Sequence, residues 1–375
     1  MKQFFTLIFS AGLLVFCTGS GDRTNEAASA PDLNAIKMPA GFSIAVFAEV
    51  EDARSMALSP DGTLFVGNKD GGSVVAVKDT DGDNKADKKW VIAKGLNMPN
   101  GVAFRNGDLY VAEVSRIIRF SGIEKKLDNP GQPAVIYDKF PSDTWHGWKY
   151  IAFGPDGKLY VPVGAPCNVC DKGNSVYASI TRMNPDGTGV EVFARGVRNT
   201  VGFTWHPQTG NIWFTDNGRD MLGDDLPPCE LNTAPIAGMH FGFPFCHAGT
   251  IKDPEFGDAR NCSEFTAPAQ QMGAHVAPLG LKFYTGSQFP DSYKNTLFVA
   301  EHGSWNRSKK NGYRIMMLKV EGNKAVSYQP FASGWLEPSS QKVSGRPVDI
   351  LLMKDGSLLV SDDKSGLIYR ISYKS

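Results

Sequence analysis

Histidine, arginine and asparagine side chains recur just before a repeated strand–turn–strand pattern in this 375-residue chain. They are Asn100, His146, the pair Arg198 and Asn199, His275 and Arg346, and Arg307 follows the fifth copy of the pattern. If the copies fold alike, these groups converge on one surface. Arginines bind carboxylates bidentately and stack on planar rings, and a histidine is the natural general base near neutral pH. The spacing therefore indicates a site for an anionic, planar ligand, with His146 as the base. The alternative for His146 is a surface or capping histidine packed against Trp145 and Trp148.

The repeated pattern consists of two apolar runs joined by a tight turn. In the third copy, Pro155-Asp156-Gly157 separates residues 150–153 from residues 159–163, as in an antiparallel hairpin. The turn residues of the six copies are 45 to 85 residues apart: Gly62, Gly107, Gly157, Gly210, Asn295 and Gly356. A period near 40 to 50 residues with several strands per unit is typical of a β-propeller. The sequence predicts an all-β protein, a six-bladed β-propeller.

Composition and periodicity together predict one folded domain over residues 33–375. The 40 glycines and 23 prolines favour a protein rich in turns. Residues 42–50 form a predicted strand that pairs with the last strands, near residues 366–373, and closes the ring. The longest interval between turns holds a predicted insertion at about residues 217–280, which contains three cysteines. Lysine plus arginine and aspartate plus glutamate both number 39, so nothing in the charge balance indicates nucleic-acid binding.

The first 32 residues are expected to lie outside this domain. Residues 1–17 read as an export signal, because Lys2 precedes an apolar run that ends at Cys17. The arrangement resembles a bacterial lipoprotein signal, with a lipid on Cys17 and a flexible tether over residues 18–32. The alternative is an ordinary signal cut after Ala30. Both alternatives place the protein in the periplasm or at the cell surface, and under the first the membrane contact is only through the lipid anchor.

The remaining cysteines are expected to form disulfides, because the predicted compartment is oxidising. We expect Cys167 to pair with Cys170 and Cys246 with Cys262, which leaves Cys229 single. Since Asp171, and not a histidine, follows Cys170, this CxxC is not a haem attachment site.

An acidic stretch in the first unit resembles the first ligands of a calcium loop. Asp79, Asp81 and Asp83 alternate along the chain, and Asp87 adds a fourth carboxylate. Trp90 stands where an EF-hand carries its bidentate glutamate. A structural calcium ion is one interpretation, and a solvated acidic turn is the other.

Several motifs taken together resemble one known family. They are HGWKYIAFGPDGKLYVPVG, CNVC, FARGVRNTVGFTWHP, FGFPFCH, HVAPLGLKFYTG, AEHGSWNR and GRPVDILLMKDGSLLVSDD. They are similar to the sorbosone dehydrogenase family, soluble quinoproteins related to PQQ-dependent glucose and aldose dehydrogenases, over about residues 33–373. The resemblance implies pyrroloquinoline quinone (PQQ) and Ca²⁺ at the mouth of the propeller. It also implies a sugar, or a related alcohol or aldehyde, as substrate and an external electron acceptor.

The resemblance assigns roles to individual residues. His146 takes the proton of the substrate hydroxyl, and Arg198 stabilises charge on the quinone oxygen. The implied cofactor contacts are Asn100, Arg198, Asn199, Arg307 and Arg346. The main-chain carbonyls near Gly218 and Arg219 are the implied ligands of the cofactor calcium.

Three positions depart from the pattern of the glucose enzymes. Ala165 stands where an aspartate orients the histidine, Cys229 replaces an acidic residue, and Arg346 stands alone where two arginines occur. Two other functions therefore stay open. One is a non-catalytic propeller that binds carbohydrate or protein. The other is a metal-dependent hydrolase of the lactonase type, which requires convergent carboxylates or histidines at the mouth.

Overall fold

The computed structural model describes residues 31–374. The predicted export signal, Cys17 and the tether up to residue 30 lie outside this part of the chain. The described chain begins with a 3-10 helix, η1 (Leu33–Ala35), which Asp32 caps through a hydrogen bond to the main-chain N–H of Asn34. No helix within residues 31–374 is long and apolar enough to cross a membrane.

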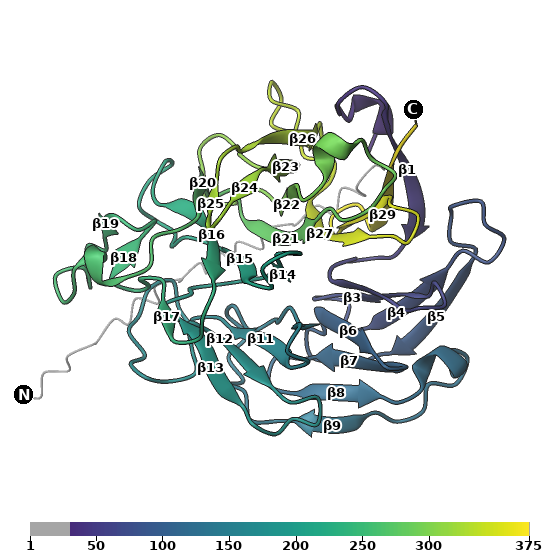
Figure 1. Cartoon of the computed structure of the whole chain (residues 1–375), viewed down its shortest axis with the longest axis horizontal. Helices are drawn as coiled ribbons and strands as arrows, with labels where there is room; N and C mark the ends of the chain where they lie inside the picture. Colours follow the sequence, from purple (N-terminus) through teal and green to yellow (C-terminus); the bar gives the residue numbers. More distant parts are fainter. Residues whose placement is uncertain (1–30, 375) are drawn as a thin grey trace, which may run out of the picture.

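Six sheets form the predicted β-propeller, and the four blade strands of each sheet are antiparallel (Figure 1). In blade 3 a short fifth strand, β17 (Met239–His240), joins the outer edge of the sheet in parallel. Blade 1 comprises β2 (Met56–Leu58), β3 (Leu64–Gly67), β4 (Val74–Lys78) and β5 (Lys88–Ala93). Blade 2 comprises β6 (Gly101–Arg105), β7 (Asp108–Ala112), β8 (Ile117–Phe120) and β9 (Ala134–Tyr137). Blade 3 comprises β10 (Ala152–Phe153), β11 (Leu159–Val163), β12 (Ser179–Met183) and β13 (Glu191–Arg195). Blade 4 comprises β14 (Phe203–Trp205), β15 (Ile212–Asp216), β16 (Pro228–Ala234) and β20 (Gln270–Ala274). Blade 5 comprises β21 (Pro278–Phe283), β22 (Leu297–Glu301), β23 (Arg314–Leu318) and β26 (Gln329–Ser333). Blade 6 comprises β27 (Pro347–Leu352), β28 (Leu358–Asp362), β29 (Leu367–Tyr373) and β1 (Phe42–Glu49).

The turns of the six repeats explain why the same hairpin recurs. Each predicted turn residue has a positive φ, from 57° at Asn295 to 91° at Gly62. Glycine adopts this backbone conformation without steric cost, and asparagine tolerates it better than most residues. The turns therefore fix the register of the first two strands in every blade.

The ring closes through strands from the two ends of the described chain. Strand β1 pairs antiparallel with β29, from Phe42 opposite Tyr373 to Glu49 opposite Leu367. The Phe42 ring packs edge-on against the rings of Phe289, Phe331 and Tyr373. This pairing confirms the predicted closure and ties the first strand to the last blade.

The second strand of each blade is buried because neighbouring blades cover both of its faces. In β3, β11 and β22 all residues are buried, and their sequences are nearly continuous apolar runs. Such runs are expected where both faces of a strand are covered. The resulting rigid wall holds the loops between blades in fixed positions.

The predicted insertion at residues 217–280 contains both blade strands and added segments. Strands β16 and β20 belong to blade 4, so the residues outside the blade are 217–227 and 235–269. The second segment carries β17 (Met239–His240), β18 (Cys246–His247), β19 (Ile251–Lys252) and η3 (Cys262–Glu264). Four further elements lie outside the blades. They are the two strands of a hairpin, β24 (Val320–Glu321) and β25 (Lys324–Ala325), and the 3-10 helices η2 (Ile123–Lys125) and η4 (Asp291–Tyr293).

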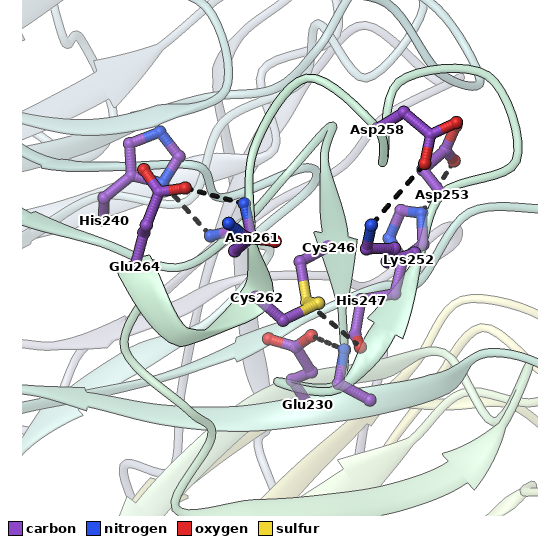
Figure 2. The surroundings of a disulfide bond; sticks show 12 residues. Glu230, His240, Cys246, His247, Lys252, Asp253, Asp258, Asn261, Cys262 and Glu264 are labelled. Carbon is purple, nitrogen blue, oxygen red and sulfur yellow. Dashed lines mark hydrogen bonds and ion pairs between the residues drawn. A yellow bond between two sulfur atoms is a disulfide. The ribbon is translucent and has the colours of Figure 1, made fainter.

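Both expected disulfides are present, and Cys229 is free and buried. Figure 2 shows the Cys246–Cys262 bond, which joins β18 to η3. Beside it, the carboxylate of Glu230 accepts a hydrogen bond from the main-chain N–H of Ala248 (2.6 Å). The disulfide and this hydrogen bond hold the segment 235–269 against blade 4.

Candidate active site

Loops between the blades enclose a cavity of about 300 Å³ at one mouth of the propeller. Five of the side chains that the repeat predicts to converge line it: His146, Arg198, Asn199, His275 and Arg346. Gly218 lines it as well, together with His302, Trp148 and Arg54. The structure therefore brings the loops before the inner strands of several blades to one place, as the repeat predicted.

His146 precedes the first strand of blade 3 and has a positive φ of 52°. Its Nδ1 lies 2.8 Å from the carbonyl oxygen of Ala165, and its Nε2 accepts a hydrogen bond from Trp145 Nε1 (3.2 Å). A Cβ atom on Gly164 would lie 2.6 Å from His146 Cβ, so glycine at that position leaves room for the histidine. Burial and the positive charge of Arg198 lower the pKa of His146 to about 3, against a weaker opposing effect of the Ala165 carbonyl. The imidazole is therefore neutral at pH 7.

A buried lysine holds the loop that carries His146. Lys149 is 1% exposed, and its Nζ donates a hydrogen bond to the Gly147 carbonyl oxygen (2.9 Å). Burial lowers the pKa of Lys149 to about 7. A side chain on Gly147 would collide with the main chain at Asp143, so this position of the loop requires glycine.

Arg198 lies between blades 3 and 4, with all five N–H donors of its guanidinium engaged. Three donate to the main-chain carbonyls of Asn168, Asn217 and Gly218, and two donate to the side chains of Asn168 and Asp220. Asn168 lies within the loop closed by the Cys167–Cys170 disulfide. Arg198 thus contributes positive charge to the cavity, while its five N–H groups all donate to the surrounding protein.

A buried carboxyl group fixes the main chain at Arg198 and Asn199. The two oxygens of Asp216 accept hydrogen bonds from the main-chain N–H groups of Arg198 (2.8 Å) and Asn199 (2.6 Å). Burial and the neighbouring Glu230 carboxyl raise the pKa of Asp216 to about 8. This contact positions two cavity residues from behind.

Four further lining residues form one group, and they come from the loops beside blades 5, 6 and 1: His302, Arg346, Asp363 and Arg54. His302 Nε2 lies 2.9 and 3.0 Å from the two oxygens of Asp363, which also forms an ion pair with Arg54. Arg346 donates hydrogen bonds to the main-chain carbonyls of His302 (3.2 Å) and Gly303 (2.9 Å). Burial lowers the pKa of His302 to about 4, although Asp363 acts in the other direction.

Two residues with implied cofactor contacts do not line the cavity. Asn100 is fully buried behind it, where its oxygen accepts from Arg54 Nε (2.6 Å) and its nitrogen donates to the Lys149 carbonyl (2.8 Å). Arg307 turns to the segment 217–227, where it donates to the Asp224 carbonyl (2.9 Å) and pairs with Asp225 (2.5 Å). In both cases the side chain is hydrogen-bonded to neighbouring protein groups outside the cavity lining.

The implied calcium ligands Gly218 and Arg219 differ in their surroundings. The Gly218 carbonyl accepts from Arg198 Nη1 (2.9 Å), whereas the Arg219 side chain points away and pairs with Asp253 (2.5 Å). Asp253 also lies 2.8 Å from His247 Nε2, which Figure 2 shows beside the disulfide. The segment 235–269 therefore secures the main chain next to Gly218.

The acidic turn of blade 1 lies apart from the cavity. One carboxylate oxygen from each of Asp79, Asp81 and Asp83 lies within 4.8 Å of the others. Asp87 instead accepts hydrogen bonds from the main-chain N–H and hydroxyl of Thr80 (2.7 and 2.6 Å). The geometry of three carboxylates is compatible with the predicted calcium loop, and Asp87 is directed elsewhere.

Two charged residues of the cavity lining, Arg54 and Asp363, were not predicted from the sequence. Arg54 stands two residues before β2, in the loop that leads into the first strand of its blade, and His146, Arg198 and Arg346 lie in the corresponding loops of their own blades. The repeat therefore carried the signal for Arg54. Asp363 follows the second strand of blade 6, and nothing in its local sequence distinguishes it from an ordinary turn aspartate.

The fold is similar to that of solved PQQ-dependent dehydrogenases. The holo form of the pyranose dehydrogenase PQQ domain from Coprinopsis cinerea superposes with a TM-score of 0.79 at 19% identity, over 92% of this chain and 99% of that one. The PQQ-bound aldose sugar dehydrogenase from Streptomyces coelicolor superposes with a TM-score of 0.65 at 21% identity, over 90% of this chain and 100% of that one. The chain thus has the six-bladed fold of PQQ-dependent sugar dehydrogenases.

Sequence comparison then gives the family. The chain belongs to the family described as "Domain of unknown function (DUF7133)", which it matches over residues 29–307. It is 36% identical over 356 residues to an uncharacterized protein of Borreliella burgdorferi, which covers 90% of this chain and 91% of that protein. The PQQ-dependent pyranose dehydrogenase of Coprinopsis cinerea is 28% identical over 237 residues, 49% of this chain and 31% of the fungal protein. The match therefore spans less than a third of that relative.

Proposed function

We propose that this protein is a PQQ-dependent oxidoreductase that oxidises a sugar, or a related alcohol or aldehyde, as a sorbosone dehydrogenase would. The observation that carries the proposal is the pairing of a neutral histidine, His146, with three arginines around one cavity. In this proposal the protein is exported, and it passes electrons to an external acceptor. A lipid on Cys17 would anchor it to the membrane.

The cavity lining suits a planar ligand that carries several carboxylates. Arg54, Arg198 and Arg346 supply positive charge, and Trp148 adds an aromatic surface. Two buried polar atoms of lining residues, Trp148 Nε1 and Asn306 Oδ1, have no hydrogen-bond partner within the described chain. Buried polar groups are nearly always hydrogen-bonded, so partnerless atoms at a cavity point to a ligand. PQQ, an aromatic tricarboxylate, matches this set of groups.

The protein's own groups then have distinct tasks. PQQ, when bound, supplies a two-electron acceptor for the hydride that leaves the substrate carbon. His146 takes the hydroxyl proton at Nε2, because the Ala165 carbonyl holds the proton at Nδ1. Trp145 Nε1 donates to that same Nε2, and its ring is 56% exposed, so the substrate hydroxyl would displace it. Arg198, held rigidly by its five hydrogen bonds, favours the growth of negative charge in the cavity.

Calcium is the second proposed cofactor, with Gly218 and Arg219 as the main-chain ligands that the resemblance implies. The Gly218 carbonyl has a second lone pair beyond the one that accepts from Arg198, and calcium prefers such oxygen ligands. The cation would increase the positive charge on the Arg198 side of the cavity.

The proposal is tested by reconstitution of the purified protein with PQQ and Ca²⁺. Dye reduction is followed with a panel of aldoses, sorbosone-like aldehydes and polyols. Turnover with at least one substrate, dependent on PQQ, is the expected result. Absence of PQQ binding would reject the proposal, and binding without turnover would favour the non-catalytic propeller.

A lactonase-type hydrolase finds less support in the geometry. The carboxylates at the cavity are paired: Asp363 with Arg54 and His302, Asp220 with Arg198, and Asp70 with Lys69. Within residues 31–374, the group of three acidic, histidine or cysteine side chains close enough for a metal is the acidic turn of blade 1. A hydrolytic metal centre therefore has no set of free ligands at this mouth.

A further inference from the structure

A short loop closed by a disulfide contacts Arg198. The chain between β11 and β12 runs over residues 164–178, and Cys167 and Cys170 are bonded to each other within it. None of the main-chain N–H groups of residues 167–172 donates a hydrogen bond within residues 31–374. The conformation of this stretch therefore depends on the disulfide and on the contacts of the residues that the disulfide encloses.

Asn168 is the residue of this loop that bonds to Arg198. Its carbonyl oxygen accepts from Arg198 Nε (2.8 Å), and its side-chain oxygen accepts from Arg198 Nη2 (2.9 Å). The same side chain bonds twice to the main chain of Asp220, because Oδ1 accepts from the N–H (2.8 Å) and Nδ2 donates to the carbonyl (3.1 Å). The Asp220 carboxylate in turn accepts from Arg198 Nη2 (3.1 Å). Three of the five Arg198 hydrogen bonds thus go to Asn168 or to the residue that Asn168 holds.

The residues that lead into this loop also contact His146. The carbonyl oxygen of Ala165 lies 2.8 Å from His146 Nδ1, and the main-chain N–H of Ala165 donates to the Arg198 carbonyl (2.8 Å). Asn168 does not line the active-site cavity, so it influences a reaction there through Arg198 and Asp220, which do line it. One short stretch of chain is therefore connected to both of the proposed catalytic side chains.

The disulfide that closes the loop is accessible from outside the active site. Both of its cysteines are half-buried. Cys170 lines a second cavity, of about 180 Å³, together with Lys172 and Arg195, and none of the proposed catalytic residues lines that cavity. Cationic neighbours favour the thiolate form of a cysteine, which is the reactive species in thiol–disulfide exchange. The other disulfide is less accessible, because Cys246 is only 2% exposed.

We propose that Asn168 is a positioning residue for the oxidation, and that the Cys167–Cys170 disulfide controls its rate by holding Asn168 against Arg198. This inference rests on the proposed function, since it takes Arg198 to act in the oxidation of a substrate. Charge that is fixed in advance lowers the barrier because no group has to rearrange during the reaction. A dithiol would reduce the disulfide: two electrons and two protons pass to the two cysteines, and the dithiol leaves as its own disulfide. Asn168 then loses the closed loop around it, and Arg198 loses fixed partners.

Replacement of Asn168 separates positioning from binding. Asn168→Leu keeps a side chain of similar size but removes its hydrogen bonds, so kcat of the PQQ-loaded protein is expected to fall about 10- to 100-fold. The KM for substrate and the affinity for PQQ should stay within about 3-fold of the wild type. Asn168→Asp keeps an oxygen acceptor for Arg198 and should recover most of the loss. Val169→Ala, inside the same disulfide loop, is the matched control and should have the kcat of the wild type.

Removal of the disulfide tests the other half of the proposal. Cys167→Ser with Cys170→Ser should lower kcat at least as much as Asn168→Leu does. The cofactor-free wild type is also treated with dithiothreitol, freed of it and loaded with PQQ without oxygen. This treatment should lower kcat to the value of the double variant, and reoxidation should restore it. The same treatment should leave the double variant unchanged, because an effect there would have to arise from Cys246–Cys262.

A measurement without cofactor separates this inference from the proposed function. Exchange of the Arg198 Nε–H with solvent is followed by nitrogen-15 NMR in the cofactor-free protein and assigned with Arg198→Lys. It should be at least about 10-fold faster in the double cysteine variant and in the reduced wild type than in the oxidised wild type and Val169→Ala. Thermal unfolding confirms that each variant is folded, and Asn168→Leu decides the matter if the double variant is not.

The outcomes that reject the inference are distinct from those that reject the function. Wild-type kcat in Asn168→Leu, or a loss of PQQ affinity as large as the loss of kcat, rejects the positioning role of Asn168. A kcat that does not respond to reduction rejects the role of the disulfide. If the wild type binds no PQQ or oxidises no substrate, the proposed function fails and proton exchange alone decides: faster exchange on reduction supports the link between the disulfide and Arg198, and unchanged exchange rejects it.

Discussion

His146 Nδ1 lies 2.8 Å from the carbonyl oxygen of Ala165, and this contact sets the tautomer of the imidazole. A carbonyl oxygen only accepts, so Nδ1 carries the proton and Nε2 keeps its lone pair. The glucose enzymes that the sequence resembles use an aspartate near this position. Here a main-chain group orients the ring, and no carboxylate within residues 31–374 pairs with His146.

Replacement of His146 tests its role as the base. His146→Gln is expected to lower kcat with PQQ by about 10²- to 10⁴-fold, because the hydroxyl proton loses its acceptor. PQQ affinity should stay within a few-fold of the wild type. Steady-state kinetics and fluorescence titration give the two numbers. His206→Gln, at a hairpin turn outside the cavity, is the control, and equal effects of both variants would contradict the assignment.

The titration of His146 in the cofactor-free protein tests its surroundings. Burial and the charge of Arg198 lower its pKa to about 3, so the ring should stay neutral and Nδ1-protonated at pH 6. The folded state then binds fewer protons than the unfolded state between pH 3 and 6.5, so this group costs stability as the pH falls through that range. Nitrogen-15 spectra of the histidine rings, assigned with His146→Gln, check the prediction. A midpoint near 6.5 would show that the ring is solvated.

Gly164 provides a steric test of the same loop. A Cβ atom there would lie 2.6 Å from His146 Cβ and 2.8 Å from the His146 carbonyl oxygen. Gly164→Ala should therefore shift His146 and reduce kcat by about 10-fold or more, since small misplacements of catalytic groups are costly. Destabilisation of about 1–3 kcal/mol is expected from overpacking, measured by urea unfolding. Wild-type kcat in this variant would mean that the position of His146 is unimportant for turnover.

The acidic turn of blade 1 gives a prediction about calcium that is separate from the cavity. If Asp79, Asp81 and Asp83 bind Ca²⁺, millimolar calcium should raise the Tm of the cofactor-free protein, because a ligand that binds only the folded state stabilises it. Asp81→Asn with Asp83→Asn should remove that increase, and Asp87→Asn should preserve it, since Asp87 bonds to Thr80. If calcium changes the Tm of the wild type, the double variant and Asp87→Asn equally, the turn is a solvated acidic turn that binds no calcium.

The architecture could be predicted well from the sequence because the residues that define each hairpin of a blade lie close together in the chain. Each turn residue with a positive φ lies between two apolar runs, so the six hairpins and their order are visible without tertiary information. The closing pair of β1 and β29 followed from the apolar strands left at the two ends. The segment 235–269 has few such signals, and its three short strands were not predicted individually.

The site was predicted less completely because side-chain direction depends on distant neighbours. His146, Arg198, Asn199, Arg346 and Gly218 line the cavity, as the repeat or the resemblance suggested. Asn100 lies outside the cavity lining and is hydrogen-bonded to Arg54, which is 46 residues away in the sequence. Arg307 also lies outside it and is hydrogen-bonded to Asp225, which is 82 residues away. Such pairings form only when blades meet, so the local sequence around Asn100 or Arg307 does not reveal them.

Reduction of bound PQQ by substrate in a single turnover tests the central claim most directly. The protein is loaded with PQQ and Ca²⁺, freed of excess cofactor and oxygen, and mixed with one aldose, aldehyde or polyol at a time. The absorbance spectrum of the bound quinone should change to that of its reduced form with at least one substrate, at a rate that falls by about 10²-fold or more in His146→Gln. Retention of PQQ with no spectral change for every substrate would contradict a dehydrogenase, and failure to retain PQQ would contradict a quinoprotein.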